Sequence, residues 1–328
     1  MNPPLALVTG ASGFVGSHIV DELLRRGARV RCLLRKTSSR RWLEGKPVEI
    51  AMGDVREEAG LDEAVRGADW IVHAAGLTHA RSPAEFHDAN VHGTEHILAA
   101  ALRQRATIRR FVYISSQAVA GPTRDGRPVT EDLAPAPVSQ YGITKLLGEE
   151  LTMLTGRMLP VVSIRPPAVY GPRDDAFLGL FQSVQRRLFP VFRKGGRVSL
   201  VHVEDLARAV WLALGNERAS GQIYFVAEPE IADYGEMGKA VMSALGKRAL
   251  TVRVPMPALL AAAFVGELWG AITRTAPFLT REKLREITAG DWIVSSAKIR
   301  DQLGWAPEIT LTEGIRGTAE WYRKAGWI

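Results

Sequence analysis

A short apolar run, Leu5-Ala6-Leu7-Val8, leads directly into three glycines at three-residue intervals, Gly10, Gly13 and Gly16, and a helical pattern follows at once. Glycine allows the backbone to turn tightly and to approach another group closely. Free N–H groups and the positive end of the helix dipole meet at such a strand–turn–helix corner and attract phosphate. The arrangement favours a pyrophosphate-binding turn over a purely structural one.

Short apolar runs alternate with amphipathic segments through the first half of the chain. We expect strands at residues 5–8, 30–34, 48–52, 70–73, 111–114 and 161–164, and helices at 16–26, 61–65, 90–103 and 141–154. Strands that alternate with helices form a parallel sheet whose two faces are both covered by the crossovers. The predicted fold class is therefore α/β, a doubly wound parallel sheet of the Rossmann type.

The alternation fades after Pro166, and helices dominate the expected pattern. We expect helices at residues 177–188, 204–214, 234–245, 258–272 and 311–324, and one strand at 223–226. This predicts a nucleotide-binding domain over residues 1–170, with later elements returning to it near 200–226. Residues 171–328 are expected to form mainly a smaller, mostly helical, substrate-binding cap.

Positive charge is concentrated in one stretch of the chain. The whole sequence has 42 basic and 35 acidic residues, a net charge of +7, whereas Arg25–Lys46 alone has nine basic residues and one acid. Electrostatic binding of nucleic acid needs a broad basic surface, so we expect no nucleic-acid partner. Four arginines of the stretch have no assigned role and are expected to face water or a neighbour: Arg25, Arg26, Arg29 and Arg31.

The second predicted strand ends without the acidic residue that would bind the ribose hydroxyls of NAD. Leu34 occupies that position, and Arg35, Lys36 and three hydroxyl residues follow it. Guanidinium and ammonium groups bind the 2′-phosphate of NADP, which a carboxylate would repel. We therefore predict NADP in preference to NAD, while a solvated loop remains the alternative for Arg40 and Arg41.

Lys145 lies four positions after Tyr141, which places the two side chains on one face of a helix. A neighbouring ammonium favours the phenolate and lowers the tyrosine pKa from its usual value of about 10. Such a tyrosine can take a proton from an alcohol or give one to a carbonyl oxygen. Ser116 follows a predicted strand, and Ser115 is expected to point to the opposite face because strand side chains alternate.

Two segments together, Val8-Thr9-Gly10-Ala11-Ser12-Gly13-Phe14-Val15-Gly16 and Tyr141-Gly142-Ile143-Thr144-Lys145, resemble the extended branch of the short-chain dehydrogenase/reductase family. The resemblance implies that Ser116 hydrogen-bonds the substrate oxygen. It also implies that Asn90 holds the lysine and a relay water, although a helix N-cap is an equal alternative for this residue. A homodimer through the helices near Asn90 and Tyr141 is a further implication.

The same resemblance implies a set of cofactor contacts, with Asp54 accepting a hydrogen bond from the adenine amine. The implied contacts are Gly10, Ser12, Gly13, Phe14, Val15, Gly16, Asp54, Val55, Ala74, Ala75, Gly76, Tyr141, Lys145, Pro166 and Val169, to which the charge argument adds Arg35 and Lys36.

A competing metal motif lies in the helix expected from residue 90. His92-Gly93-Thr94-Glu95-His96 has the H-x-x-E-H spacing of one metallopeptidase class. A crossover helix in a nucleotide-binding sheet is poorly placed for such a site, so we predict no metal. The single cysteine, Cys32, lies in an apolar strand and is expected to be a small buried hydrophobe. The first residues lack a signal-peptide pattern, which predicts a cytoplasmic protein.

The substrate has to be inferred from the second half of the chain, because extended family members include both sugar-nucleotide epimerases or dehydratases and ketone or steroid reductases. Sugar-nucleotide enzymes usually have an asparagine where this chain has Ala168, and Arg-Asp-Phe where it has residues 198–200. Three basic residues that could bind the diphosphate of a sugar nucleotide lie nearby, so that alternative stays open: Arg193, Lys194 and Arg197.

The apolar segment 258–266, followed by Leu268 and Trp269, would suit the wall of an apolar pocket. A buried cap helix is equally compatible, and attachment to a membrane interface is a third interpretation. The uncharged stretch Val254–Gly266 is too short to span a bilayer.

We therefore predict NADP(H)-dependent reduction of a carbonyl, or the reverse oxidation, on a relatively apolar small molecule. A sugar-nucleotide epimerase or dehydratase and a cofactor-sensing regulator are the alternatives, and the regulator would not need Ser116, Tyr141 and Lys145.

Overall fold

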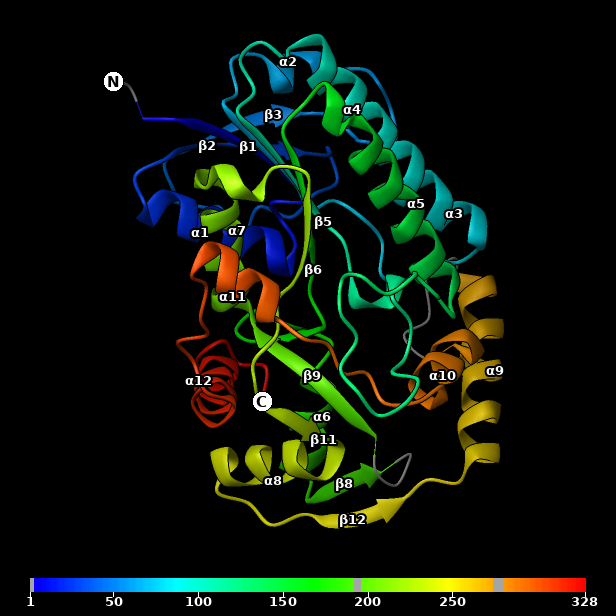
Figure 1. Ribbon diagram of the computed structural model, residues 1–328. Coiled ribbons are helices and arrows are strands. Elements are labelled where there is room, and N and C mark those ends of the chain that lie inside the picture. The colour runs from blue at the N-terminus through cyan, green and yellow to red at the C-terminus, as the bar shows by residue number, and fades with distance from the viewer. Residues whose placement is uncertain (1–2, 192–195, 274–279) are drawn as a thin grey trace.

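The main sheet has seven parallel strands in the order β10-β6-β5-β4-β1-β2-β3. A computed structural model describes residues 3–191, 196–273 and 280–328, without the side chains of residues 271 and 272 (Figure 1). The strands are β1 (Leu5–Thr9), β2 (Arg29–Leu34), β3 (Val48–Met52), β4 (Trp70–His73), β5 (Arg110–Ile114), β6 (Val161–Arg165) and β10 (Gln222–Phe225). The predicted doubly wound α/β fold is confirmed.

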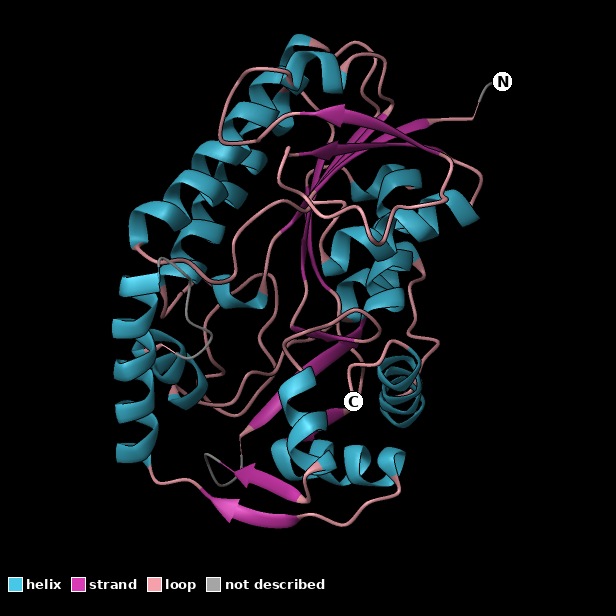
Figure 2. Cartoon of the chain, turned by 180° about the vertical axis from the view of Figure 1, so that it is seen from behind, coloured by secondary structure: helices cyan, strands magenta, loops and turns pink. Residues whose placement is uncertain are grey.

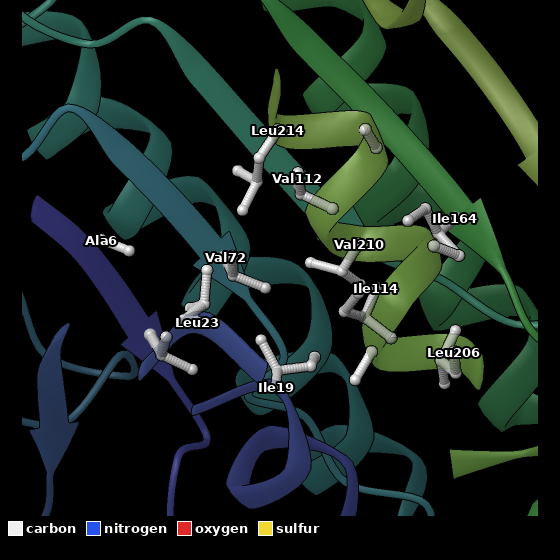
Figure 3. Close-up of a cluster of buried hydrophobic side chains, with 14 of the residues drawn as sticks. Ala6, Ile19, Leu23, Val72, Val112, Ile114, Ile164, Leu206, Val210 and Leu214 are labelled. Carbon is white, nitrogen blue, oxygen red and sulfur yellow. The ribbon is translucent and has the colours of Figure 1, made fainter. Parts of the chain in front are cut away.

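Helices cover both faces of this sheet because successive strand residues point to opposite sides. Helices α1 (Phe14–Arg25) and α7 (Val203–Gly215) lie side by side on one face, where Figure 3 shows their leucine and isoleucine side chains meeting Val72 and Val112. Helices α2 (Leu61–Val65), α4 (Gly93–Arg103) and α5 (Gln140–Leu154) belong to the other face. The two apolar clusters fix the sheet between them.

One long helix leads from the fourth strand toward the fifth. It begins as α3 (Pro83–His87), passes through a π-helical turn at Asp88–His92 and continues as α4. Ser82 caps its first turn by accepting a hydrogen bond from the Glu85 N–H at 3.3 Å. The helix therefore begins before residue 90, the start expected from the sequence.

The second half of the chain contains more strands than its sequence pattern indicates. β7 (Ala168–Tyr170), β9 (Arg197–His202) and β11 (Ile231–Asp233) form one small sheet, and β8 (Leu188–Val191) pairs with β12 (Leu250–Arg253). The expected helix 177–188 is α6 (Leu178–Gln185) followed by β8. Arg187 has a φ of 62°, which a right-handed helix cannot accommodate.

The remaining helices complete the cap, the name used here for the elements around these two small sheets. They are α8 (Tyr234–Leu245), α9 (Met256–Thr273), α10 (Arg281–Thr288) and α12 (Leu311–Lys324), while α11 (Ala297–Leu303) packs on the main sheet with α1 and α7. Figures 1 and 2 both show α9 at the outer edge of the molecule, beside α10. None of the helices in the described residues has the length and apolar character needed to cross a bilayer.

Candidate active site

At the glycine turn, residues 10–16, the backbone after β1 closely approaches the backbone after β4. Gly10 has a φ of 69°, and a Cβ added there would lie 2.7 Å from backbone atoms of Ala74 and Ala75. The Gly13 N–H donates to the Gly10 carbonyl at 3.0 Å, and α1 then begins without a side-chain cap. Ser12, Phe14 and Val15 are half-buried around the turn. A close backbone approach beside an uncapped helix start fits a dinucleotide pyrophosphate.

Arg35 and Lys36 are exposed directly after β2, beside the strand that carries the glycine turn. They open a tight turn in which the Ser38 N–H donates to the Arg35 carbonyl at 3.0 Å. Arg40 lies further along the same loop, with its guanidinium 3.9 Å from the Met52 sulfur. The loop therefore presents cations at the C-terminal edge of the sheet.

Asp54 and Val55 follow β3 at the same edge. The Asp54 carboxylate accepts hydrogen bonds from the Arg56 guanidinium at 2.6 Å and from the Arg56 backbone N–H at 3.0 Å. Burial opposes ionisation of Asp54, but the Arg56 hydrogen bonds outweigh it and lower the pKa, with a further contribution from the charge of Arg35. Sequence reasoning missed Arg56, although it stands two residues after Asp54.

The other cations of the basic stretch form ion pairs with carboxylates that lie outside it or at its border. Arg25 and Arg26 pair with Glu22, Arg29 and Arg31 pair with Glu49, and Lys46 pairs with Asp21. Arg25, Arg26 and Arg29 are exposed, as expected, and Arg31 is half-buried. The structure adds the carboxylate partner of each. Among the described residues, Arg35, Lys36, Arg40 and Arg41 form no ion pair, so the unneutralised charge of the stretch lies in the loop after β2.

This loop is also held from the far side by aromatic rings. The Trp42 ring lies 5.6 Å from that of Trp321 in α12 and 6.5 Å from that of Trp327, between ring centroids. The Arg41 guanidinium stacks 4.2 Å from the centroid of Trp42. The loop after β2 is therefore packed against the end of α12, which sequence reasoning did not anticipate.

Asn90 joins the loop after β4 to helix α5. Its side chain accepts from the Leu77 N–H at 2.8 Å and donates to the Thr144 hydroxyl at 3.1 Å. A Cβ on Gly76 would lie 2.9 Å from the Asn90 Oδ1 and 3.8 Å from the Lys145 Nζ. Because Asn90 sits inside the π-helical turn, the N-cap alternative is wrong.

The Ser116 hydroxyl lies near the Tyr141 phenol, close enough to influence its pKa. Ser116 also accepts from the Ala118 N–H at 3.1 Å, whereas the neighbouring Ser115 is buried. Burial raises the pKa of Tyr141 to about 12, and the Ser116 hydroxyl only partly opposes the rise. The chain on its own therefore keeps the phenol protonated, opposite to the direction expected from Lys145.

Lys145 lies one helical turn after Tyr141. Its Nζ donates to the Ile114 carbonyl at 2.7 Å and lies 4.2 Å from the centroid of the Tyr113 ring. Burial lowers the pKa of Lys145 to about 7, and the charge of Glu149 opposes that change. The ammonium is thus poised between its two protonation states near neutral pH.

Glu149 continues the four-residue spacing of Tyr141 and Lys145 along α5. It is buried and bonds the Arg165 guanidinium at 2.5 Å and the Ser163 hydroxyl at 2.6 Å. Pro166, directly after Arg165, is buried. Val169 is half-buried in β7, where it pairs with Val201 of β9.

Helix α10 of the cap approaches the start of α5. The Gln140 backbone N–H donates to the Glu282 carboxylate, and the charge of Glu286 contributes to the raised pKa of Tyr141. Neither glutamate was singled out from the sequence. The cap therefore supplies acidic side chains next to the phenol.

The H-x-x-E-H histidines point to local partners. His92 pairs with Glu95 at 3.3 Å, and His96 bonds the Val55 carbonyl at 2.9 Å. In the part of the chain that the structure describes, no group of three or more His, Cys, Asp or Glu side chains is placed to hold a metal ion.

The candidate residues lie around the C-terminal edge of one parallel sheet, the usual ligand position of doubly wound folds. Ser116, Tyr141, Lys145, Asn90 and Gly76 converge, while the glycine turn, Arg35 and Asp54 follow β1, β2 and β3 along the edge. This fold and site define a class, the NAD(P)-dependent α/β oxidoreductases.

The chain belongs to the NAD dependent epimerase/dehydratase family, which matches residues 6–227, and it is of the extended short-chain dehydrogenase/reductase type. It is 32% identical to a ceramide reductase of Caulobacter vibrioides, with 98% of this chain and 95% of the relative covered. It is also 32% identical to a 4-hydroxy-2-methyl-3-oxo-4-farnesyl-3,4-dihydroquinoline-1-oxide ketoreductase of Stigmatella aurantiaca, with 94% and 93% covered.

A solved structure shares the whole architecture. The UDP-glucose 4-epimerase of Thermus thermophilus, in complex with NAD, superposes with a TM-score of 0.79 at 26% identity, and 98% of this chain and 99% of that chain are covered. The relatives thus include reductases as well as epimerases.

Proposed function

We propose that the protein is an NADP(H)-dependent oxidoreductase that reduces a carbonyl on a relatively apolar small molecule, or oxidises the corresponding alcohol. The observation that carries the proposal is the convergence of Ser116, Tyr141 and Lys145 at the C-terminal end of β5, where the Lys145 Nζ donates to the Ile114 carbonyl at 2.7 Å. A pKa of about 12 makes Tyr141 a proton donor at neutral pH, as carbonyl reduction requires.

The side chains divide the remaining tasks. Ser116 and Tyr141 together offer two hydroxyl groups to one substrate oxygen, which fixes its position. Lys145 places positive charge beside Tyr141 when protonated, and Asn90 holds the loop and helix on which the lysine depends. A nicotinamide cofactor, when bound, supplies or accepts the hydride.

The preference for NADP rests on the charge of the loop after β2. Arg35, Lys36 and Arg40 make no ion pair within the described residues, so they are available to a 2′-phosphate. Arg56 lies at the same edge, but its charge is paired with the Asp54 carboxylate. A phosphate has several acceptor oxygens, which suits such a group of donors.

An apolar substrate is supported by the names of two relatives, a ceramide reductase and a ketoreductase of a farnesylated quinoline oxide. Ala168 leaves a small residue at the position where sugar-nucleotide enzymes usually have asparagine. Arg197 pairs with Asp291 at 2.9 Å, so it is already engaged. Arg193 and Lys194 lie outside the described residues.

A sugar-nucleotide epimerase or dehydratase remains the second candidate, because the epimerase fold covers nearly the whole chain. The two activities separate in one assay. The protein would be incubated with NADPH and a panel of apolar ketones, and with sugar nucleotides, while absorbance and products are followed. Ketone-dependent consumption of NADPH supports the proposal. Interconversion of sugar nucleotides without net cofactor change would overturn the proposal in favour of an epimerase or dehydratase. Binding of NADP without either reaction would favour a cofactor-sensing regulator.

Two variants test the residue roles in the same assay. Tyr141→Phe removes the proton donor, and general acid catalysis contributes about 10²- to 10⁴-fold, so the rate should fall by that amount. Arg35→Ala should weaken NADP binding more than NAD binding, whereas Arg66→Ala, an exposed arginine paired with Glu63, should change neither. Equal weakening of both cofactors by Arg35→Ala would contradict the NADP assignment.

A further inference from the structure

Helix α9 exposes an almost entirely apolar surface. Its 18 residues include one charged side chain, Glu267, which bonds Arg281 of α10 at 2.8 Å. The exposed fractions of its large apolar side chains are 44% for Leu260, 56% for Phe264, 63% for Val265, 56% for Leu268 and 65% for Trp269. The interpretation of this segment as a buried cap helix is therefore wrong.

Among the described residues, only a narrow stripe of α9 is covered by other elements. Leu259 and Ala263 are buried against Leu284 of α10, and Gly270 continues the stripe. A helix that is apolar on all sides is normally buried on all sides. Contiguous apolar surface of this kind marks an interaction site. The opposite side of α9 therefore needs a covering partner, and Figures 1 and 2 both place this helix at the outer edge of the fold.

Basic residues border the apolar surface at the N-terminal end of α9. The paired strands β8 and β12 expose Leu188 at 47%, Leu250 at 69% and Val252 at 39%. Around them lie four exposed arginines that form no ion pair within the described residues: Arg186, Arg187, Arg248 and Arg253. Residues 247–289 contain seven basic and three acidic side chains. Apolar side chains mixed with arginine match the chemistry of an anionic bilayer interface.

A second copy of the chain fits this surface less well. In a two-fold dimer the same patch meets itself, so the second copy would bring its own arginines and no added acidic partner for them. Anionic headgroups would neutralise the arginines instead, while Phe264, Leu268 and Trp269 would lie among the upper acyl chains. Tryptophan is favoured at that depth.

We propose that the outward side of α9, together with the β8–β12 edge, docks on the surface of an anionic phospholipid bilayer. Helix α10 connects this docking face to the candidate active site, because Leu284 contacts α9 and Glu282 bonds the start of α5. The site would then lie next to the lipid surface. The proposal concerns binding and does not depend on the nature of the reaction.

The test is co-sedimentation of the full chain with vesicles. The protein should bind phosphatidylcholine vesicles that contain phosphatidylglycerol much more strongly than pure phosphatidylcholine vesicles, and salt should weaken the binding. The triple variant Phe264→Ser, Leu268→Ser, Trp269→Ser should lose at least about tenfold in affinity. Arg248→Glu with Arg253→Glu should weaken binding to anionic vesicles by about tenfold or more.

Matched controls keep the result decisive. Leu154→Ser with Met158→Ser removes equally exposed apolar side chains from another surface and should leave vesicle binding unchanged. Circular dichroism and NADP binding of every variant should match the unmodified protein, which separates lost docking from lost folding. Failure of the unmodified protein to bind anionic vesicles at low salt would overturn the proposal. So would a lipid-free dimer that the triple variant converts to a monomer, because a second copy would then cover α9.

Discussion

Glu149 neutralises one buried cation and influences another. Its carboxylate bonds Arg165, whose side chain is 3% exposed, and its charge acts on the Lys145 ammonium one turn earlier. A buried cation without a partner is strongly unfavourable, whereas an exposed one is solvated. The same carboxylate therefore contributes to stability and to the protonation state of the candidate site.

Glu149→Gln should lower the free energy of unfolding by about 3 kcal/mol or more, because Arg165 loses its partner in the interior. It should also lower the pKa of Lys145 below its value of about 7. As the pH is raised, Lys145 should then lose its charge, and the protein its cofactor affinity, at a lower pH than in the unmodified protein. Urea unfolding and cofactor titrations across pH measure the two effects. Glu150→Gln, an exposed neighbour on the same helix, should change stability by less than about 0.5 kcal/mol; equal effects of both changes would contradict this explanation.

For single residues, spacing in the sequence predicted which side chains meet in the candidate site. It did not predict how the surrounding structure shifts their pKa values. The four-residue interval brought Tyr141 and Lys145 onto one face, and extending it to Glu149 would have found the third member. The pKa of Tyr141 depends on burial and on the charge of Glu286 in the distant helix α10, so the sequence alone led to the wrong direction. The pairing of Arg29 and Arg31 with Glu49 was missed because the partner lies on a neighbouring strand.

Among the elements, the strands of the main sheet were predictable because each is a short run rich in apolar residues, and β1, β4, β5 and β6 are buried on both faces. The strands β7, β8, β9, β11 and β12 were missed, since four of them have at most four residues and all are stabilised by partners distant in sequence. The turn between β1 and α1 was the clearest element in the sequence, and its geometry gives the next prediction.

Gly10→Ala should disrupt this turn, because its positive φ strains any L side chain and the new Cβ would meet the Ala74 and Ala75 backbone at 2.7 Å. Strain of this kind costs about 1–3 kcal/mol, so cofactor affinity or thermal stability should fall accordingly. Fluorescence titration with NADPH and thermal melting measure the two quantities. Gly179→Ala, in α6 with nothing within 4 Å of the added Cβ, is the matched control and should be nearly neutral. Normal cofactor binding and stability in Gly10→Ala would show that the turn tolerates a side chain.

Across the whole molecule, the aromatic contacts of Trp42 with Trp321 and Trp327 connect the start of the fold to its last helix. Aromatic pairs contribute about 0.5–1.5 kcal/mol beyond their burial. Removing Trp327 should therefore loosen the loop that carries Arg35 without touching the glycine turn.

Trp327→Ala should reduce the affinity for NADP relative to NAD by about threefold to tenfold, because the loop must then be ordered on binding. Parallel titrations with both cofactors give this ratio directly. Trp269→Ala removes an exposed tryptophan from α9 and should leave the ratio unchanged. A ratio that stays constant in Trp327→Ala would mean that the loop keeps its shape without α12.

The contact between Trp42 and α12 also has an evolutionary consequence. Coenzyme preference in a lineage of such proteins could drift through substitutions at positions 321 and 327, while every residue that touches the coenzyme stays the same. Ancestral reconstruction that compares only the phosphate-binding segments would then miss the change, and positions 42, 321 and 327 should be substituted together more often than independent inheritance would produce.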